Sequence, residues 1–212
     1  LIIIAGLDPA SSGHTAAVVI GLDPTTNKRY VLDISNKPGM TPEEMRNLIK
    51  DWTSRYNVAE WRIEKNGFQG FLVHDRELNE YCAARGTNIK PHFTGTNKHD
   101  SDFGVASMTT LFAGYEDGHQ MIELPSTAQS ESAKQMIEQL VSWSPSAPKG
   151  QKTDIVMALW FAELGCRDRV TLYSNFGQSH QKNSFLTPWD RSNQTTVNLL
   201  EAEADRRFRP ML

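Results

Sequence analysis

The chain has 212 residues, with 39% hydrophobic and 9% aromatic residues, which is typical of a globular protein with one sizeable core. A formal net charge of −3 excludes a uniformly basic nucleic-acid-binding protein, although a local basic surface remains compatible with it. Cys82 and Cys166 lack the spacing of a zinc site or a disulfide framework. No apolar run approaches the roughly 20 residues that span a bilayer, and no basic segment precedes the first one, so we expect a cytosolic protein without a membrane partner.

The first third of the chain predicts three successive strands, at residues 1–7, 15–20 and 29–34. The first of these is almost entirely apolar, which is typical of a central strand that is buried on both faces. Turn-forming residues at 9–13 and 23–27 separate the strands. The pattern therefore predicts an antiparallel meander that begins with a central strand.

A helix with a strong start signal follows the meander. Thr41 can cap it, Pro42 lies in its first turn, and Glu44 completes a capping box. Another strand-like segment, 58–63, comes next, so that strand, helix and strand resemble a parallel crossover unit. The apolar residues that share one face of this helix are Met45, Leu48, Ile49, Trp52 and Tyr56.

The second half alternates helices with short extended segments. Helices are predicted at 71–84, 107–115 and 128–143, and extended segments at 88–93 and 120–124. The order of all these elements predicts an α/β protein with the ribonuclease H-like fold. Its mixed sheet would have five or more strands, flanked by helices, with the first strand in the middle.

A last helix is expected from Asp154 to about Gly165. From about Ser174 the sequence becomes polar, with scattered Asn, Gln and Ser. We therefore expect one domain at residues 1–170, followed by a tail at 171–212 that is loosely attached or docks to a partner.

Three acidic residues lie at element boundaries where this fold can bring them together. Asp8 ends the first strand, Glu64 ends the fourth, and Asp154 opens the last helix. Converged carboxylates repel one another unless a cation lies between them. Mg²⁺ or Mn²⁺, with coordination positions left for phosphate and water, suits such a cluster. The pattern indicates metal-dependent phosphodiester cleavage with two ions, Asp8 bridging them and the other two acids holding one each.

Each acid also has a simpler structural interpretation. Asp8 before proline is a common turn residue. Glu64 shares strand parity with Glu60 and Arg62, so a solvated strand face would explain it as well. Asp154 is a favourable charge in the first turn of a helix. The catalytic interpretation therefore depends on the ordered set of three.

Basic residues near these acids are candidates for contact with DNA. We expect Lys98 and Lys152 to contact phosphate near the site. No element that reads bases is visible, which predicts weak sequence preference. His14 can approach the site but is interpreted as a loop histidine, and His92 has no partner at ligand spacing. Further candidates for a basic rim are Lys65, His99, Lys149, Arg167 and Arg169.

Three segments in order, 6–9, 63–67 and 153–160, resemble the C-terminal nuclease domain of the large terminase subunit of tailed bacteriophages. A fourth segment, 94–98, is similar to a basic stretch of that family. The resemblance covers roughly residues 1–165. It supports the assignment of the three acids as catalytic residues and metal ligands.

The resemblance implies an endonuclease that cuts concatemeric viral double-stranded DNA during genome packaging, in the cytoplasm of the infected bacterial host. It also implies three partners: an N-terminal ATPase domain, a portal protein and a small terminase subunit. The chain has no Gly-x-x-x-x-Gly-Lys-Ser/Thr phosphate loop and starts in a strand, so we expect the ATPase domain to lie outside it. Many relatives have two adjacent acids at the third motif, whereas Thr153 precedes Asp154 here.

Two other functions compete with this one. A Holliday-junction resolvase of the same fold also begins with a strand that ends in Gly-x-Asp-Pro. From another class, an actin-like nucleotide-binding domain opens with a similar Gly/Ser/Thr-rich hairpin, as at residues 11–15, but needs a second phosphate-binding hairpin that the sequence lacks. A catalytically silent docking module is the remaining alternative.

Overall fold

The computed structural model describes residues 1–10, 13–66, 70–113, 120–128, 130–145 and 150–184. The chain divides into two compact units, Leu1–Val170 and Thr171–Leu212. Among the described helices, none has the length and apolarity needed to cross a membrane.

The first unit contains a mixed sheet of six strands. Their bounds are Ile2–Asp8 for β1, His14–Leu22 for β2, Arg29–Pro38 for β3, Glu60–Glu64 for β4, Asn88–His92 for β5 and Ile122–Glu123 for β6. The strand order is β5-β4-β1-β2-β3-β6. The first three strands pair antiparallel, whereas β4 is parallel to β1, β5 to β4, and β6 to β3. The predicted meander and the interior position of the first strand are confirmed.

Helices connect and cover these strands. Their bounds are Pro42–Tyr56 for α1, Gly70–His74 for α2, Arg76–Ala83 for α3, Thr109–Ala113 for α4, Glu131–Ser142 for α5 and Asp154–Ser184 for α6, with 3-10 turns η2 at Thr96–His99 and η3 at Val105–Met108. The predicted capping box of α1 is present, because the Thr41 hydroxyl accepts from the Glu44 N–H at 3.2 Å and the Glu44 carboxylate accepts from the Thr41 N–H at 2.7 Å.

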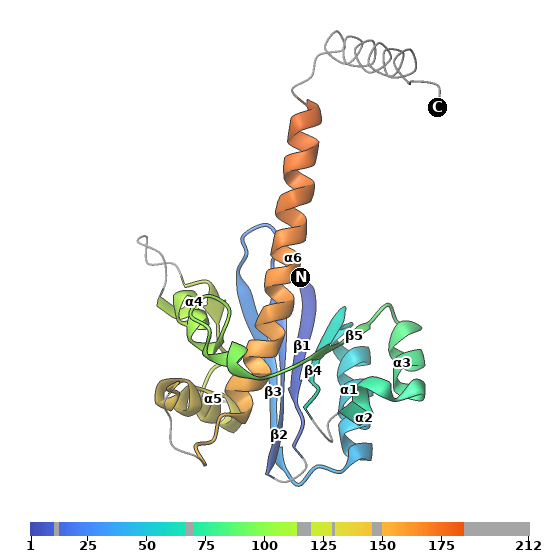
Figure 1. The fold of residues 1–212 in the computed structure, drawn as a ribbon, viewed down its shortest axis with the longest axis vertical. Coiled ribbons are helices and arrows are strands. Elements are labelled where there is room, and N and C mark those ends of the chain that lie inside the picture. The colour runs from blue at the N-terminus through green and yellow to red at the C-terminus, as the bar shows by residue number, and fades with distance from the viewer. Residues whose placement is uncertain (11–12, 67–69, 114–119, 129, 146–149, 185–212) are drawn as a thin grey trace, which may run out of the picture. The chain divides into compact units, whose positions relative to one another are not determined.

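Helices cover both faces of the sheet, with α5 and α6 on one side and α1, α2 and α3 on the other (Figure 1). Each face has its own buried cluster, since successive residues of a strand point to opposite sides. In β1, Ile4 packs on the α6 side, whereas Ala5 and Leu7 pack on the α1 side. On that second side Trp52 stacks on Trp61 with 6.1 Å between ring centroids, so these aromatic rings are core residues.

Two predicted helices differ from the structure. The helix expected at 71–84 is two helices, because Asp75 leaves helical geometry and its carboxylate accepts from the Leu78 N–H at 2.9 Å as the cap of α3. The last helix does not end near Gly165 but continues to Ser184. A β-carbon at Gly165 would lie 2.6 Å from Ile4 Cγ2, so this glycine permits close packing and does not end the helix.

A second glycine fixes the position of α6 on the sheet. A β-carbon at Gly6 of β1 would lie 2.0 Å from the Ala158 carbonyl oxygen and 2.6 Å from the Ala162 nitrogen. These are backbone atoms, which cannot rotate away. The backbones of β1 and α6 therefore touch at Gly6, which places the first turn of α6 over the carboxyl end of β1.

Replacing Gly6 with alanine should destabilise the fold. The added methyl group has no room, and overpacking of this kind typically costs about 1–3 kcal/mol. Urea denaturation followed by circular dichroism measures the loss. The matched control is Gly70→Ala, because a β-carbon there meets nothing closer than 3.7 Å. Equal stability of the Gly6→Ala protein and the wild type would contradict the close approach.

Candidate active site

The three predicted acids lie at one end of the sheet. Asp8 ends β1 and Glu64 ends the neighbouring parallel strand β4. The register pairs Leu7 with Ile63, which brings the two acids next to each other at the same edge. Strand alternation places Asp8 on the same side as Gly6, which is the side covered by α6. Asp154 opens α6 and so reaches the same place from above the sheet.

Electrostatic interactions join the three side chains. Burial raises the pKa of Asp8 well above its usual value, and the charge of Glu64, a hydrogen bond with Glu64 and the charge of Asp154 raise it further. Lys98 acts in the opposite direction. Burial and the two neighbouring acidic charges thus disfavour the ionised form of the Asp8 carboxyl. The structure thus brings together the three acids that the sequence singled out.

The pKa of Asp154 is raised less than that of Asp8. Burial raises its pKa, whereas its own backbone N–H, His14 and Lys152 lower it. His14 lies at the start of β2, not in a loop, and shares strand parity with Ala16 of the cluster under α6. Two of the predicted site neighbours, Lys98 and Lys152, are therefore close enough to act on the acids.

The donor set fits a divalent cation, although the side chains do not form a finished metal site. Within the described part of the chain, no three His, Cys, Asp or Glu side chains are arranged so that they could hold a metal ion. Asp8 and Glu64 instead contact each other through a hydrogen bond. Carboxylate oxygens are the ligands that Mg²⁺ and Mn²⁺ prefer, and a cation between them would remove the repulsion that raises the Asp8 pKa.

Asn66 orients Glu64, a role that the sequence analysis missed. Its side-chain amide donates to Glu64 Oε1 at 2.9 Å and to the Thr94 carbonyl oxygen at 2.8 Å. The amide thereby ties the end of β4 to the chain beyond β5. In the sequence, the signal for this role was a polar residue two positions after the acid that ends the strand.

His92 also lies beside the site, although the sequence gave it no partner. It pairs with Glu64 in the parallel register of β4 and β5. Its ring centroid lies 5.0 Å from that of Trp160 and 5.2 Å from that of Phe161. Burial lowers the pKa of His92, the charge of Arg62 lowers it further, and Glu64 opposes the change. The imidazole is therefore uncharged at neutral pH and borders the site.

Gln139 of α5 holds the first turn of α6. This side chain is buried, and its Oε1 accepts from the N–H groups of Ile155 at 2.9 Å and Val156 at 3.4 Å. Backbone N–H groups in the first turn of a helix have no partner within the helix. Gln139 supplies that partner and so positions the turn that carries Asp154.

The other predicted basic residues lie in different places. Lys65 lies over the Phe93 ring, with its Nζ 5.7 Å from the centroid. His99 is exposed at the end of η2, next to Lys98. Lys149 lies outside the described residues.

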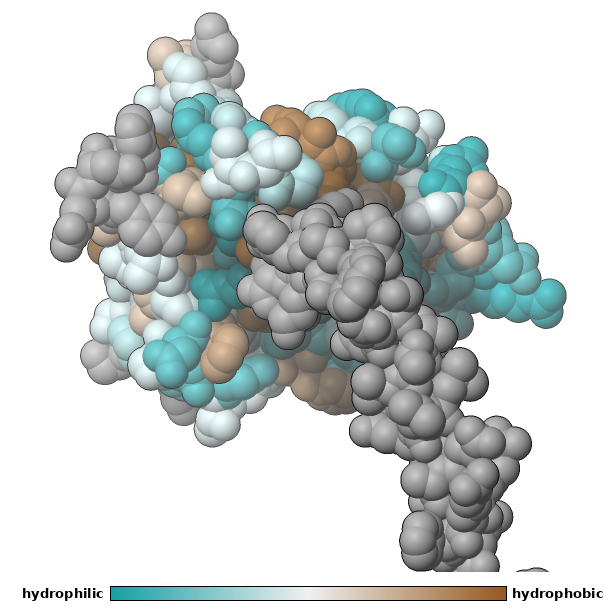
Figure 2. Space-filling view, turned by 90° about the horizontal axis from the view of Figure 1, so that it is seen from above, coloured by the Kyte–Doolittle hydropathy of each residue, from teal (hydrophilic) through white to brown (hydrophobic). Residues whose placement is uncertain are grey.

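The prediction that Arg167 and Arg169 join a rim around the acids is wrong. They follow Asp154 by 13 and 15 residues along one helix, which corresponds to roughly 20 Å. Arg167 pairs with Glu163 at 3.2 Å, and Arg169 pairs with Glu60 at 3.3 Å. Figure 2 views this opposite end of the sheet, where strongly hydrophilic residues lie next to smaller apolar areas.

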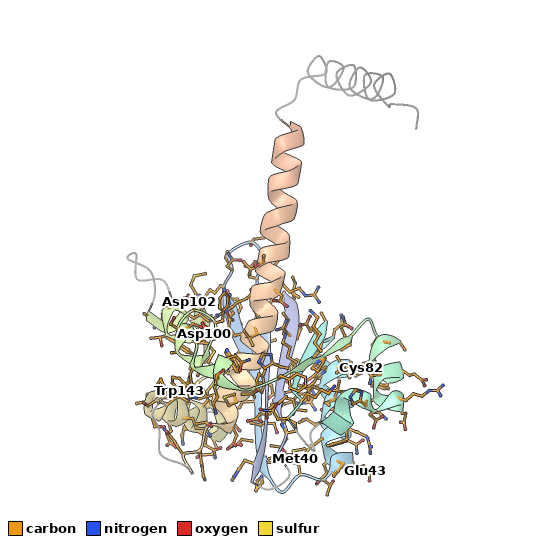
Figure 3. The ribbon with its side chains drawn as sticks, viewed as in Figure 1. Met40, Glu43, Cys82, Asp100, Asp102 and Trp143 are labelled. Carbon is orange, nitrogen blue, oxygen red and sulfur yellow. The ribbon has the colours of Figure 1, made fainter. Side chains whose placement is uncertain are left out.

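The interpretation of Glu60 and Arg62 as a solvated strand face is also wrong. Glu60 is fully buried beneath α6 and forms salt bridges with Arg62 and Lys90, both at 2.9 Å. The acidic loop residues Asp100 and Asp102, in contrast, lie near α4 (Figure 3). The Asp100 carboxylate accepts from the backbone N–H groups of Asp102 and Phe103, which makes this run a polar loop.

A mixed sheet with its first strand inside, and acids at the ends of β1, β4 and the start of α6, defines a ribonuclease H-like domain. A family model described as the terminase RNase H-like domain matches residues 5–159. The chain therefore belongs to the terminase RNase H-like domain family and is a nuclease domain, which confirms the fold and the family resemblance.

Two solved terminase nuclease domains agree with this fold. The large terminase nuclease of thermophilic phage G20c, with bound zinc, is 19% identical, with a TM-score of 0.51 over 77% of this chain and 80% of that one. The nuclease domain of the large terminase subunit gp2 of bacterial virus Sf6 is 10% identical, with a TM-score of 0.56 over 76% and 87%. The fowlpox virus Holliday junction resolvase is 13% identical, with a TM-score of 0.47 over 79% and 99%. No curated protein sequence matches the chain.

Asp8→Asn should raise the melting temperature of the protein in a chelating buffer at pH 7. Because the folded-state pKa of Asp8 is raised, folding loses stability as the pH rises from the ordinary carboxyl range towards that pKa. Asparagine removes this penalty, and each 1 kcal/mol removed raises the Tm by about 2–4 °C at this chain length. The difference from wild type should shrink towards pH 4. The exposed Asp102→Asn is the control, and an unchanged or lower Tm for Asp8→Asn would contradict the strained pair.

Gln139→Leu should destabilise the domain by about 1–3 kcal/mol, because it leaves two buried N–H groups without a partner. Gln139→Glu keeps an acceptor at the helix start and should lose much less. Urea denaturation of the two variants compares them directly. Equal losses would show that the acceptor atom does not matter.

Proposed function

We propose that this domain is a metal-dependent endonuclease that cuts concatemeric viral double-stranded DNA during the packaging of a bacteriophage genome. The observation that supports it most directly is the meeting of Asp8, Glu64 and Asp154 at one edge of the sheet. The charges of Glu64 and Asp154 raise the pKa of Asp8, so the three acids form a poor structural contact. A divalent cation would relieve this repulsion, and carboxylates are the ligands that such a cation prefers.

Mg²⁺ or Mn²⁺ would be held by these three acids, with two ions as the expected number and Asp8 between them. Bound ions supply an activated water and neutralise charge that develops on the phosphate. Divalent cations also occur in related nucleases: the G20c structure contains zinc, and a variant of the Sf6 nuclease domain was solved with calcium and with manganese.

The residues of this chain around the acids have separate tasks in the proposal. Asn66 keeps Glu64 in position, and Gln139 keeps the start of α6 in position. Lys98 and Lys152 contact phosphate, since each acts electrostatically on one of the acids and brings a positive charge to the site. Lys65 and Lys149 extend this contact along the DNA backbone.

The cellular setting follows from the same proposal. The domain works in the cytoplasm of the infected bacterial host, together with an N-terminal ATPase domain, a portal protein and a small terminase subunit. The tail at 171–212 is the segment assigned to partner docking.

Cleavage of supercoiled plasmid tests the proposal. With Mg²⁺ or Mn²⁺ the wild type should nick and linearise plasmid, and a chelator should stop it. The rate should fall at least about a hundredfold in each of three variants, Asp8→Asn, Glu64→Gln and Asp154→Asn. Residues that only contact a metal ligand already contribute about 10–100-fold, and these acids would hold the ions directly. Asp102→Asn is the matched control, since it removes an exposed loop carboxylate.

Near-wild-type cleavage by Asp8→Asn would overturn the bridging role. A synthetic four-way junction that is cut much faster than plasmid or linear duplex would favour the resolvase alternative. Failure of the wild type to cut any DNA with either cation would overturn the nuclease proposal for the isolated chain.

A further inference from the structure

The edge of the sheet that carries the acids also carries an exposed aromatic ring. Strand β5 is parallel to β4, and its last residue, His92, pairs with Glu64. Phe93 is the next residue of the chain, so it lies one position beyond this edge. It is 64% exposed. A large apolar side chain is therefore open to solvent beside the proposed cleavage site.

Hydrogen bonds from residues of the site hold the backbone around Phe93. The Asn66 side-chain amide, which donates to Glu64, also donates to the Thr94 carbonyl oxygen at 2.8 Å. The carbonyl oxygen of Phe93 itself accepts from the Asn97 side-chain amide at 2.8 Å. Single exposed apolar residues are common, so exposure alone does not indicate a function. Phe93 differs because its backbone has a fixed position relative to a proposed metal ligand.

Positive charge lies beside the ring. The Lys65 Nζ is 5.7 Å from the centroid of the Phe93 ring, which is the geometry of a cation–π contact. Proteins that bind an unpaired nucleic-acid strand combine the same two groups: cationic side chains follow the phosphates, and bases stack on aromatic rings. The chemistry of this pair therefore fits DNA better than it fits an apolar protein surface.

The flat faces of the bases are the part of DNA that an aromatic ring recognises. In an intact duplex the neighbouring base pairs cover these faces. Phe93 can reach one only where the strand is unpaired or where two base pairs have separated. Phenylalanine is among the side chains that proteins insert between base pairs, which unstacks the step and kinks the duplex. A duplex substrate is therefore compatible with stacking on Phe93.

Resting on the proposed function, we infer that Phe93 stacks on one base next to the phosphate that is cut, at a step that opens in the bound DNA. Lys65 binds the adjoining phosphate. Every base has a face that can stack, so this contact positions the strand at the acids without reading its sequence. The role agrees with the weak sequence preference that the sequence predicts.

Binding of single strands tests the inference without cleavage. The full chain is titrated at low salt, in a chelating buffer, with fluorescein-labelled oligo-dT and with an abasic strand of the same length, and anisotropy gives each Kd. The wild type should bind oligo-dT roughly 5–150-fold more tightly, which is the range that stacking of one base provides. Phe93→Ala should reduce this ratio to about one.

Two further substitutions distinguish stacking from apolar contact. Phe93→Trp keeps an aromatic ring and should retain the preference for oligo-dT. Phe93→Leu keeps an apolar side chain without a ring and should lose it. Lys65→Gln should weaken binding to both strands, and it should reduce the salt dependence of log Kd by about one unit because one phosphate contact is lost.

Phe103→Ala is the matched control. Phe103 is 66% exposed, but it follows Asp102, whose carbonyl oxygen accepts from Arg167 at 3.1 Å, far along α6 from the acids. This variant should keep the wild-type ratio. Because the rings at positions 93 and 103 are both exposed, both alanine variants should melt at the wild-type temperature, so a change in binding does not reflect unfolding.

Equal affinity of the wild type for oligo-dT and the abasic strand, or no binding to either, overturns the inference. So does a preference that both Phe93→Ala and Phe93→Leu retain.

The plasmid assay separates this inference from the proposed function. Cleavage by the wild type without any difference between the two strands would leave the nuclease proposal standing and remove the stacking role. A preference for oligo-dT that depends on Phe93, without cleavage under any divalent cation, would do the reverse.

Discussion

The backbones of β1 and α6 touch at Gly6, where a β-carbon would lie 2.0 Å from the Ala158 carbonyl oxygen. This contact sets the height and direction of the helix above the central strand. Asp154 lies one turn before Ala158, so the same contact decides how far its carboxylate is from Asp8. Gln139 completes the arrangement by satisfying the first N–H groups of the helix. The geometry of the acidic site thus depends on a glycine and a glutamine, neither of which carries charge.

Buried carboxylates occur at both ends of the sheet, and their partners distinguish structure from function. At one end Glu60 and Glu163 are fully buried, and arginines pair with both, including Arg29 at 3.0 Å from Glu163. At the other end, buried Glu64 and partly buried Asp8 have no salt bridge within the described residues, and the charge of Glu64 raises the pKa of Asp8. An uncompensated pair of this kind is costly unless a cation or a substrate completes it. Carboxylates that stabilise the fold are therefore paired with arginines, whereas those of the acidic site are not. Burial alone does not distinguish the two kinds.

The sequence by itself determined the features that depend on neighbouring residues. The capping box at Thr41, the apolar first strand and the order of the three acids are local signals, and they were sufficient for the fold class and the candidate ligands. Only the tertiary structure decided what depends on distant packing: the length of α6 beyond Gly165, the burial of Glu60, and the neighbours Asn66 and His92. A glycine in a helix looks the same in sequence whether it ends the helix or lets a strand approach. The partner that distinguishes these cases, here Ile4, is more than 150 residues away along the chain.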